Sequence, residues 1–331
     1  MGVPAGPMVS FVVPCYNYGR YLFECLHSIF DQQGTYSFEI VLIDDGSTDN
    51  THEVLRLFRD PRLRVIVHPK NQGHVAAINE GLSRTQGSFI ARIDPDDRYR
   101  PYFLQATLEK FQAFPEVGLV YGDAAMIDEQ GRITAERCDS IHGGQDFKGN
   151  ELVMLLEKNF ICSPTVIVRR EAWQKALPVP EGLAFHDWFF TLMMAREYDF
   201  YYIDRVLADY RVHPLNHHSK VVRDKTEEPS IFWLLHRIFE TSERTQEMEE
   251  QKQRFRKRIY AAQYLTLANK YFGFQMDSDA RRCYLQAIRY RPQYLIGPAT
   301  LRRLIGTFMG RRAYERSKYV LKGVLRLGPV K

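Results

Sequence analysis

The first 130 residues of this 331-residue chain alternate between short apolar runs and segments with helical spacing. The apolar runs contain many β-branched residues and lie at 9–14, 38–47, 63–69, 88–94 and 117–128. The helical segments between them lie at 20–32, 48–60, 74–87 and 100–115. Strands that lack a regular polar face are typical of a parallel sheet covered by helices on both sides. The pattern therefore predicts an α/β fold with a mostly parallel central sheet.

Polar segments follow the first four predicted strands. They read PCYNYG, DDGSTDN, PKNQG and DPDD, in chain order. Open α/β sheets bind their ligands beyond the carboxyl ends of their strands. We therefore expect these four segments to converge on one crevice.

The fourth segment gathers negative charge. Asp94, Asp96 and Asp97 lie within four positions, directly after an apolar strand. Acidic clusters usually lie solvated at the surface, but here the preceding residues direct the strand into the core. Carboxylates held together near a core destabilise the fold unless something positive neutralises them. The segment therefore predicts a bound cation.

Taken together, four stretches resemble the successive motifs of the family 2 glycosyltransferases, which have the GT-A fold. They read VVPCYNYGRYLFECLHSI, FEIVLIDDGSTDNT, NQGHVAAIN and GSFIARIDPDD, and the resemblance extends over roughly residues 8–220. It implies a metal-dependent, inverting transfer of a hexosyl-type sugar from a nucleotide diphosphate-sugar, UDP-linked in our reading, to an acceptor hydroxyl. It also implies a carbohydrate or lipid-linked acceptor, in the assembly of cell-surface polysaccharide, lipopolysaccharide or glycolipid.

The resemblance also implies a set of donor-binding residues. An aromatic ring at Tyr16 can lie against a nucleobase. Carboxylates at Asp44 and Asp45 can accept hydrogen bonds from a uracil imide or a ribose hydroxyl, with Asp45 favoured for the base. The alternative for Asp45 is a plain turn before a helix cap. The full donor-binding set is Pro14, Tyr16, Asn17, Asp44, Asp45, Asn71, Gly73, Asp94 and Arg211.

The resemblance identifies the expected cation as Mn²⁺ or Mg²⁺. Asp94-Pro95-Asp96 matches the family's D-x-D motif, so Asp96 is the expected metal ligand and Asp94 faces the ribose or a metal-bound water. Asp97 is expected to orient its neighbours. His213, in the stretch ADYRVHPLNHHS, is expected near the metal or the diphosphate, and imidazole suits Mn²⁺ better than Mg²⁺. The alternative is a loop histidine without a ligand, and His217 and His218 are further candidates in the same stretch.

The stretch GLAFHDWFFTLMMA resembles the region that carries the family's catalytic base. Asp187 is the expected base, which takes the proton from the attacking hydroxyl. His186 stands where the family more often has Glu, which leaves a second carboxylate role open. The alternative for Asp187 is a helix N-cap.

The third motif departs from the family pattern in one place. It reads Ala77-Ile78-Asn79 where Ala-Arg-Asn is frequent. Arg92, Arg98 or Arg211 could supply the missing positive charge.

The chain changes character after about residue 222. We expect a glycosyltransferase domain over 1–222 and a basic helical domain over 223–331. From Arg254 to the end there are 18 basic and 3 acidic residues, which leaves 27 basic and 37 acidic before it. A single tetratricopeptide-like repeat is expected at about 261–294. One repeat cannot usually stand alone, so it is expected to pack on the first domain or to form a homodimer.

The basic, amphipathic last segment fits an anionic membrane surface, with a solvated basic face as the alternative. The five cysteines lack metal-site spacing, and we find neither a signal peptide nor an apolar run long enough to span a membrane. We therefore expect a cytoplasmic protein, peripheral to the inner face of the membrane.

Two other functions were weighed. A sugar nucleotidyltransferase of similar fold would carry a glycine-rich, basic phosphate loop after the first strand, and PCYNYGRY does not. A nucleic-acid-binding protein could use the basic end, but no zinc-finger, RNA-recognition or helix-turn-helix signature is recognisable. We therefore expect no nucleic-acid partner.

Overall fold

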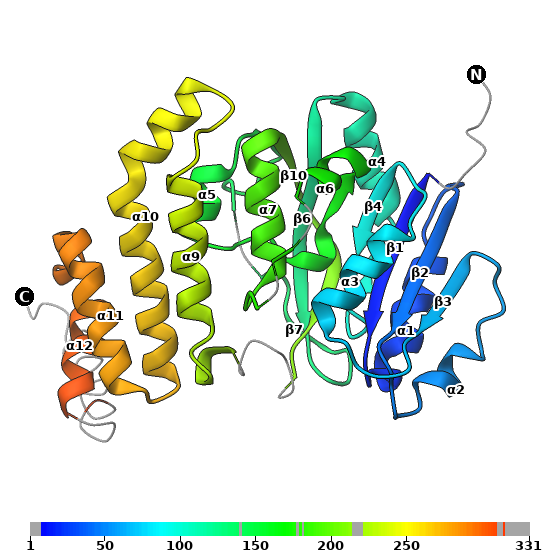
Figure 1. Cartoon of the computed structure of the whole chain (residues 1–331), viewed down its shortest axis with the longest axis horizontal. Coiled ribbons are helices and arrows are strands. Elements are labelled where there is room, and N and C mark those ends of the chain that lie inside the picture. Colours follow the sequence, from blue (N-terminus) through cyan, green and yellow to red (C-terminus); the bar gives the residue numbers. More distant parts are fainter. Residues whose placement is uncertain are drawn as a thin grey trace, which may run out of the picture. The chain divides into compact units, whose positions relative to one another are not determined.

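The computed structural model describes residues 8–138, 141–176, 179–180, 182–213, 221–309 and 314. The chain divides into two compact units. The first comprises Met1–Leu155 and Asn159–Asn216, and the second comprises Leu156–Lys158 and His217–Lys331. Figure 1 shows a sheet flanked by helices in the first unit and helices in the second.

The amino-terminal half of the sheet is parallel. Its strands run in the order β3-β2-β1-β4, and each pair is parallel. They are β1 (Val9–Cys15), β2 (Phe38–Asp44), β3 (Leu63–Val67) and β4 (Phe89–Arg92). The helices between them are α1 (Gly19–Phe30), α2 (Thr51–Leu55) and α3 (His74–Ser83). The carboxyl ends of the four strands therefore meet at one edge, as the sequence predicted.

The second half of the sheet is mixed. Strands β6 (Val117–Ile127) and β10 (Asp199–Arg211) pair in parallel, and β9 (Ile167–Arg169) lies antiparallel between β4 and β6. Three short strands add antiparallel pairs: β5 (Arg98–Tyr99), β7 (Ile133–Ala135) and β8 (Phe147–Gly149). The remaining helices are α4 (Phe103–Ala113), α5 (Leu152–Glu157), η1 (Ser163–Thr165), α6 (Arg170–Lys175) and α7 (His186–Glu197). The α/β class and the mostly parallel central sheet are confirmed.

Both faces of the central strands are buried. Every residue of β1 is buried, and its Phe11 and Val13 lie in one core cluster with Leu26 of α1 and Phe103 of α4. A second, smaller cluster on β2 and α3 contains Val41, Ile43 and Ala77. Burial on two faces explains why the strand sequences lack polar alternation.

The predicted elements near the sheet edge are longer than the observed ones. Helix α2 covers only Thr51–Leu55 of the predicted 48–60. Strand β3 lies at the end of the strand order beside β2, and its Val65 and Val67 are exposed. At an edge, apolar spacing overstates how far an element extends because fewer tertiary contacts hold its ends.

The second unit contains α9 (Glu227–Phe239), α10 (Gln246–Gly273), α11 (Asp277–Tyr290), η2 (Pro292–Leu295) and α12 (Pro298–Met309). Thr245 caps α10, since its hydroxyl accepts from the Met248 amide. Helices α10 and α11 pack together, and both contribute buried side chains: Leu267, Ala268, Tyr271, Ala280, Tyr284 and Ala287. A tetratricopeptide-like repeat at these positions stays a prediction, as do the domain limits. In the described parts of the chain, none of the helices is long and apolar enough to cross a bilayer.

Candidate active site

The loops after β1 and β2 are joined by Asn17. Its backbone is in the left-handed region, with φ of 59°. Its side-chain oxygen accepts from the amides of Thr48, at 2.8 Å, and Asp49, at 3.3 Å, and its own amide donates to Ser47 Oγ at 2.9 Å. Asn17 therefore shapes the loop pair. The neighbouring Tyr16 has 42% of its surface exposed. Pro14 is buried within β1.

Asp44 and Asp45 are both buried at the end of β2. Asp44 Oδ1 accepts from the Ser47 amide at 3.0 Å, and Asp44 Oδ2 lies 3.3 Å from His52 Nε2. Asp45 is held more tightly, because it accepts from the amides of Gln72 and Gly73, each at 2.8 Å. The two aspartates thus tie the β2 loop to its own turn and to the segment after β3.

Gly73 and Asn71 occupy that segment. Gly73 has φ of 99°, a conformation that glycine adopts without strain, and this geometry turns its amide toward Asp45 Oδ2. Asn71 is exposed. The structure therefore gives Gly73 a loop-shaping position and leaves the Asn71 side chain accessible.

His68 is a site residue that the sequence reasoning missed. Its Nδ1 lies 2.6 Å from Asp45 Oδ1, and its Nε2 lies 2.9 Å from Glu80 Oε2. Burial disfavours the imidazolium, but the hydrogen bonds to Asp45 and Glu80 outweigh burial and raise the pKa of His68. In the sequence His68 lies near the end of the predicted third strand, at the same edge of the sheet as Asp45.

The acidic cluster after β4 is held by three different partners. Asp94, one third exposed, accepts from Arg92 Nη1 at 3.0 Å. Asp96 Oδ2 lies 2.9 Å from His213 Nε2. Asp97 Oδ1 accepts from the Arg211 amide at 2.8 Å.

These contacts do not neutralise the cluster. Asp97 Oδ2 is buried and has no hydrogen-bond partner. Burial, then the charges of Asp96 and Asp94, hold the pKa of Asp97 well above its usual range. The pKa values of Tyr18 and Tyr210 are also raised, mainly by burial and in addition by the charges of these carboxylates. The carboxylates therefore oppose further negative charge at this site.

Arg211 does not present its guanidinium to open space. The side chain is fully buried, and its Nε donates to the Asp96 carbonyl at 2.7 Å. Its Nη1 donates to the Asp128 carbonyl at 3.0 Å and its Nη2 to Glu24 at 2.8 Å. Arg211 thus holds the acidic loop in place, and a direct donor contact from it stays a prediction.

His213 is buried beside two tyrosine rings. Its ring centroid lies 5.6 Å from that of Tyr21 and 6.0 Å from that of Tyr18. With Nε2 directed at Asp96, His213 orients that carboxylate. His217 and His218, the other predicted candidates, lie outside the described residues.

Asp187 lies in the first turn of α7 and is not its N-cap. The cap position is Phe185, which makes no side-chain cap hydrogen bond. One carboxylate oxygen of Asp187 accepts from Asn159 Nδ2 at 3.3 Å. The N-cap alternative is therefore wrong, since the helix begins one residue before Asp187.

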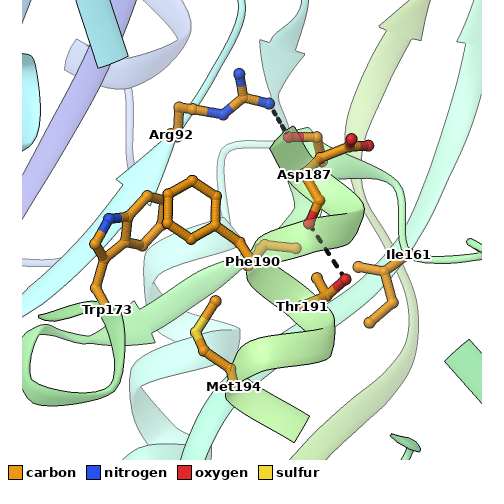
Figure 2. Close-up of a pocket in the computed structure, with 9 residues that line it drawn as sticks. Arg92, Ile161, Trp173, Asp187, Phe190, Thr191 and Met194 are labelled. Carbon is orange, nitrogen blue, oxygen red and sulfur yellow. Dashed lines mark hydrogen bonds between the residues drawn. The ribbon is translucent and has the colours of Figure 1, made fainter. Parts of the chain in front are cut away.

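A pocket lies against the first turns of α7. Figure 2 shows Arg92 at one side of it, with the Trp173 and Phe190 rings and the Met194 side chain below. The full lining is Arg92, Ile161, Ser163, Val166, Trp173, Asp187, Phe190, Thr191 and Met194. Arg92 donates to both Ser163 and Asp94, so the same side chain joins this pocket to the acidic cluster.

Of the three arginines considered for the missing positive charge, Arg92 alone lines this pocket. Arg98 is paired with Asp209 at 2.6 Å, and Arg211 is enclosed as described above. Arg92 therefore brings a positive charge to the boundary between the acidic cluster and Asp187.

A preformed protein cage for a metal is not found among the residues that the structure describes. No group of three or more His, Cys, Asp or Glu side chains is arranged there to hold an ion. Mg²⁺ and Mn²⁺ bound with a nucleotide need only one or two carboxylates, because the phosphates supply other ligands. The mutual repulsion of Asp94, Asp96 and Asp97 fits a cation that arrives with its substrate.

Solved structures of similar fold cover almost the whole chain. S. aureus TarS in complex with UDP-GlcNAc matches with a TM-score of 0.60 and 19% identity, over 94% of this chain and 91% of that one. The mannosyltransferase PcManGT of Pyrobaculum calidifontis, in complex with GDP-Man and Mn²⁺, matches with a TM-score of 0.59 and 18% identity, over 96% and 87%. At this identity the likeness concerns the fold, and it confirms the predicted GT-A-like architecture.

Relatives in sequence give the class of the protein. An uncharacterised glycosyltransferase of Nostoc sp. is 28% identical over 231 residues, 66% of this chain and 69% of that protein. A Bacillus subtilis glycosyltransferase named for teichuronic acid biosynthesis, TuaG, is 35% identical over 105 residues, which span 31% of this chain and 41% of that one. The family model "Glycosyl transferase family 2" matches residues 10–176, about half of the chain. The chain therefore belongs to glycosyltransferase family 2, and it is a glycosyltransferase.

Proposed function

We propose that this enzyme transfers a sugar from a UDP-sugar to an acceptor hydroxyl, with inversion and with the help of Mn²⁺ or Mg²⁺. One observation carries the proposal: an acidic cluster that opposes further negative charge is joined through Arg92 to a pocket that contains a carboxylate on another element. Support also comes from similar structures, since one binds UDP-GlcNAc and another binds GDP-Man with Mn²⁺.

The donor nucleotide is assigned to the loops after β1, β2 and β3. The exposed ring of Tyr16 offers a face to the base, and the accessible Asn71 side chain offers polar contacts. Asp45 is already bonded to Gly73, so it reaches a base or ribose only if its loop rearranges. We therefore assign Asn17, Asp44 and Gly73 chiefly to shaping this loop pair.

The metal is assigned to Asp96 and Asp94, together with oxygens of the donor diphosphate. A divalent ion there would neutralise the charge that develops on the departing nucleotide. His213 fixes the orientation of Asp96, and Arg211 fixes the loop backbone, as groups around a metal site commonly do. Because His213 Nε2 is used in this way, direct ligation by His213 would have to use its other ring nitrogen, Nδ1.

Asp187 is assigned as the general base. Asn159 holds one of its oxygens, which leaves the other to accept the proton of the acceptor hydroxyl. Transfer with inversion follows when that hydroxyl attacks the anomeric carbon from the side opposite the leaving nucleotide.

The acceptor and the cellular setting are assigned more broadly. The relative named for teichuronic acid biosynthesis supports a carbohydrate or lipid-linked acceptor in cell-surface polysaccharide assembly. We further propose a cytoplasmic enzyme, peripheral to an anionic membrane, in which the helical unit with its tetratricopeptide-like repeat provides membrane contact or a homodimer. Leu301, Ile305 and Phe308 are spaced along one face of α12 and are exposed, which fits the membrane proposal.

The test is Asp187→Asn, which removes the base and retains the shape of the side chain. The rate of sugar release from UDP-sugars with Mn²⁺, to water or to an acceptor, should fall by about 10²–10⁴-fold. UDP affinity, measured by calorimetry with Mn²⁺, should stay within about twofold because Asp187 lies outside the nucleotide loops. Asp31→Asn, at an exposed position, is the matched control. A variant that keeps more than about a tenth of the rate would contradict the assignment of Asp187.

A further inference from the structure

The pocket beside Asp187 has two chemically different parts. Its deeper lining consists of buried apolar side chains: Ile161, Trp173, Phe190 and Met194. Its partly exposed lining residues are Ser163, Val166 and Asp187, so the pocket opens on their side. The volume of the cavity is about 30 Å³.

The deeper part does not suit a sugar hydroxyl. A hydroxyl pressed against these side chains would lose its hydrogen bonds to water and find few in exchange. The Thr191 hydroxyl can only accept from such a group, since its own proton is donated to the Asp187 carbonyl, at 3.2 Å, or the Trp188 carbonyl, at 3.1 Å. A methyl group, in contrast, gains from burial there.

The mouth of the pocket suits a carbonyl oxygen. Ser163 Oγ accepts a hydrogen bond from Arg92, so the proton of its own hydroxyl can be donated to a ligand. The cationic Arg92 stands beside it, and the same arginine contacts Asp94 of the proposed metal site. A group bound here would therefore lie next to the reacting sugar.

A methyl group joined to a carbonyl is an acyl group, and its usual form on a sugar is the acetamido substituent. We propose that this pocket is a subsite for the N-acetyl group of a 2-acetamido sugar. The methyl packs on the apolar floor and the carbonyl accepts from Ser163 and Arg92. This rests on the proposed function, and it narrows the substrate class to N-acetylhexosamines.

The acetamido group can belong to the donor or to the acceptor. The first arm of the test compares kcat/KM for hydrolysis of UDP-GlcNAc and UDP-GalNAc with that of UDP-Glc and UDP-Gal, each with Mn²⁺. The second arm measures how free N-acetylglucosamine and glucose change the turnover of each donor. A preference of about tenfold or more in either arm supports the proposal and identifies the source.

Two variants connect that preference to the pocket. Ile161→Phe should fill the space and lower the acetamido preference at least about tenfold. Ser163→Ala, a smaller change, should lower the acetamido preference through loss of the contact to the carbonyl. This variant provides the test if Ile161→Phe does not fold. Ile133→Phe is the matched control because Ile133 is exposed on β7.

The outcomes separate the two proposals. Hydrolysis of UDP-sugars without an acetamido preference in either arm overturns the subsite and leaves the proposed function intact. A preference that both pocket variants retain also overturns the subsite. Absence of any metal-dependent hydrolysis or transfer, with all four donors and both sugars, contradicts the proposed function and the subsite with it.

Discussion

Asp97→Asn should stabilise the metal-free protein while impairing its metal-dependent chemistry. The variant keeps an oxygen to accept from the Arg211 amide and removes a buried charge that lies beside Asp96 and Asp94. In place of Asp97 Oδ2, a buried oxygen without a partner, it puts an amide nitrogen that is still buried but carries no charge. A buried unsatisfied polar group costs about 1–3 kcal/mol, and more when charged. We therefore expect the free energy of unfolding to rise by about 1–3 kcal/mol at pH 8 in EDTA.

The pH dependence gives the same prediction a second measurement. The pKa of Asp97 in the folded protein is raised above its unfolded value of 3.8. Its contribution to stability is therefore fully present below that unfolded pKa and is lost as the pH rises through the folded pKa. The wild-type protein should lose stability relative to Asp97→Asn as the pH rises, and the two should converge in acid.

The assay is urea unfolding from pH 4 to pH 8 in EDTA, followed by thermal unfolding with UDP and Mn²⁺. A gain of 1–3 kcal/mol corresponds to roughly 1.5–4 °C in Tm for a chain of 331 residues. With UDP and Mn²⁺ the difference in Tm between the variant and the wild type should shrink or change sign, since the bound cation stabilises the wild type. Asp31→Asn, on the surface, should change stability by no more than about 0.5 kcal/mol. A loss of stability in Asp97→Asn at pH 8 in EDTA would refute the argument that the cluster carries uncompensated charge.

Three further predictions concern the metal ligand, a buried glutamate and the basic end of the chain. Asp96→Asn should abolish the Mn²⁺-dependent part of UDP binding in calorimetry while Tm changes little, and unchanged metal dependence would remove Asp96 from the metal site. Glu151 is buried and hydrogen-bonded to Tyr121 and His142, and burial raises its pKa from 4.5 to about 7. Its contribution to stability should therefore be lost as the pH rises from about 4.5 through 7, by roughly 3 kcal/mol. Glu151→Gln should flatten that part of the stability profile, and a slope equal to that of wild type would contradict the assignment. Truncation from residue 296 onward should weaken binding to anionic liposomes at low salt more than it weakens donor hydrolysis, whereas equal liposome binding would count against the membrane proposal.

Local patterns in the sequence predicted most of the sheet. Apolar runs without polar alternation located β1, β2 and β4, because residues buried on two faces must be apolar wherever they lie in the chain. The order of polar segments after these strands also predicted that their carboxyl ends would meet. The antiparallel strand β9 was not predicted, since a three-residue strand leaves no periodic signal.

The sequence also identified the residue types of the site, but not what each of them contacts. Asp94, Asp96 and Asp97 were recognised as a charge cluster from their spacing alone. The roles of Arg211 and His213 depend on where the end of β10 lies in the folded chain. The structure places Arg211 under the acidic loop and His213 against Asp96, more than 100 positions away in the chain.

Only the tertiary structure revealed the pocket beside Asp187. Arg92 comes from the end of β4, Ser163 from η1 and Phe190 from α7, and no local pattern connects them. A short-range signal such as apolar spacing reports whether a side chain is buried, because burial depends on the face of its own element. It does not report which distant side chain lies opposite, because that depends on how several elements pack together.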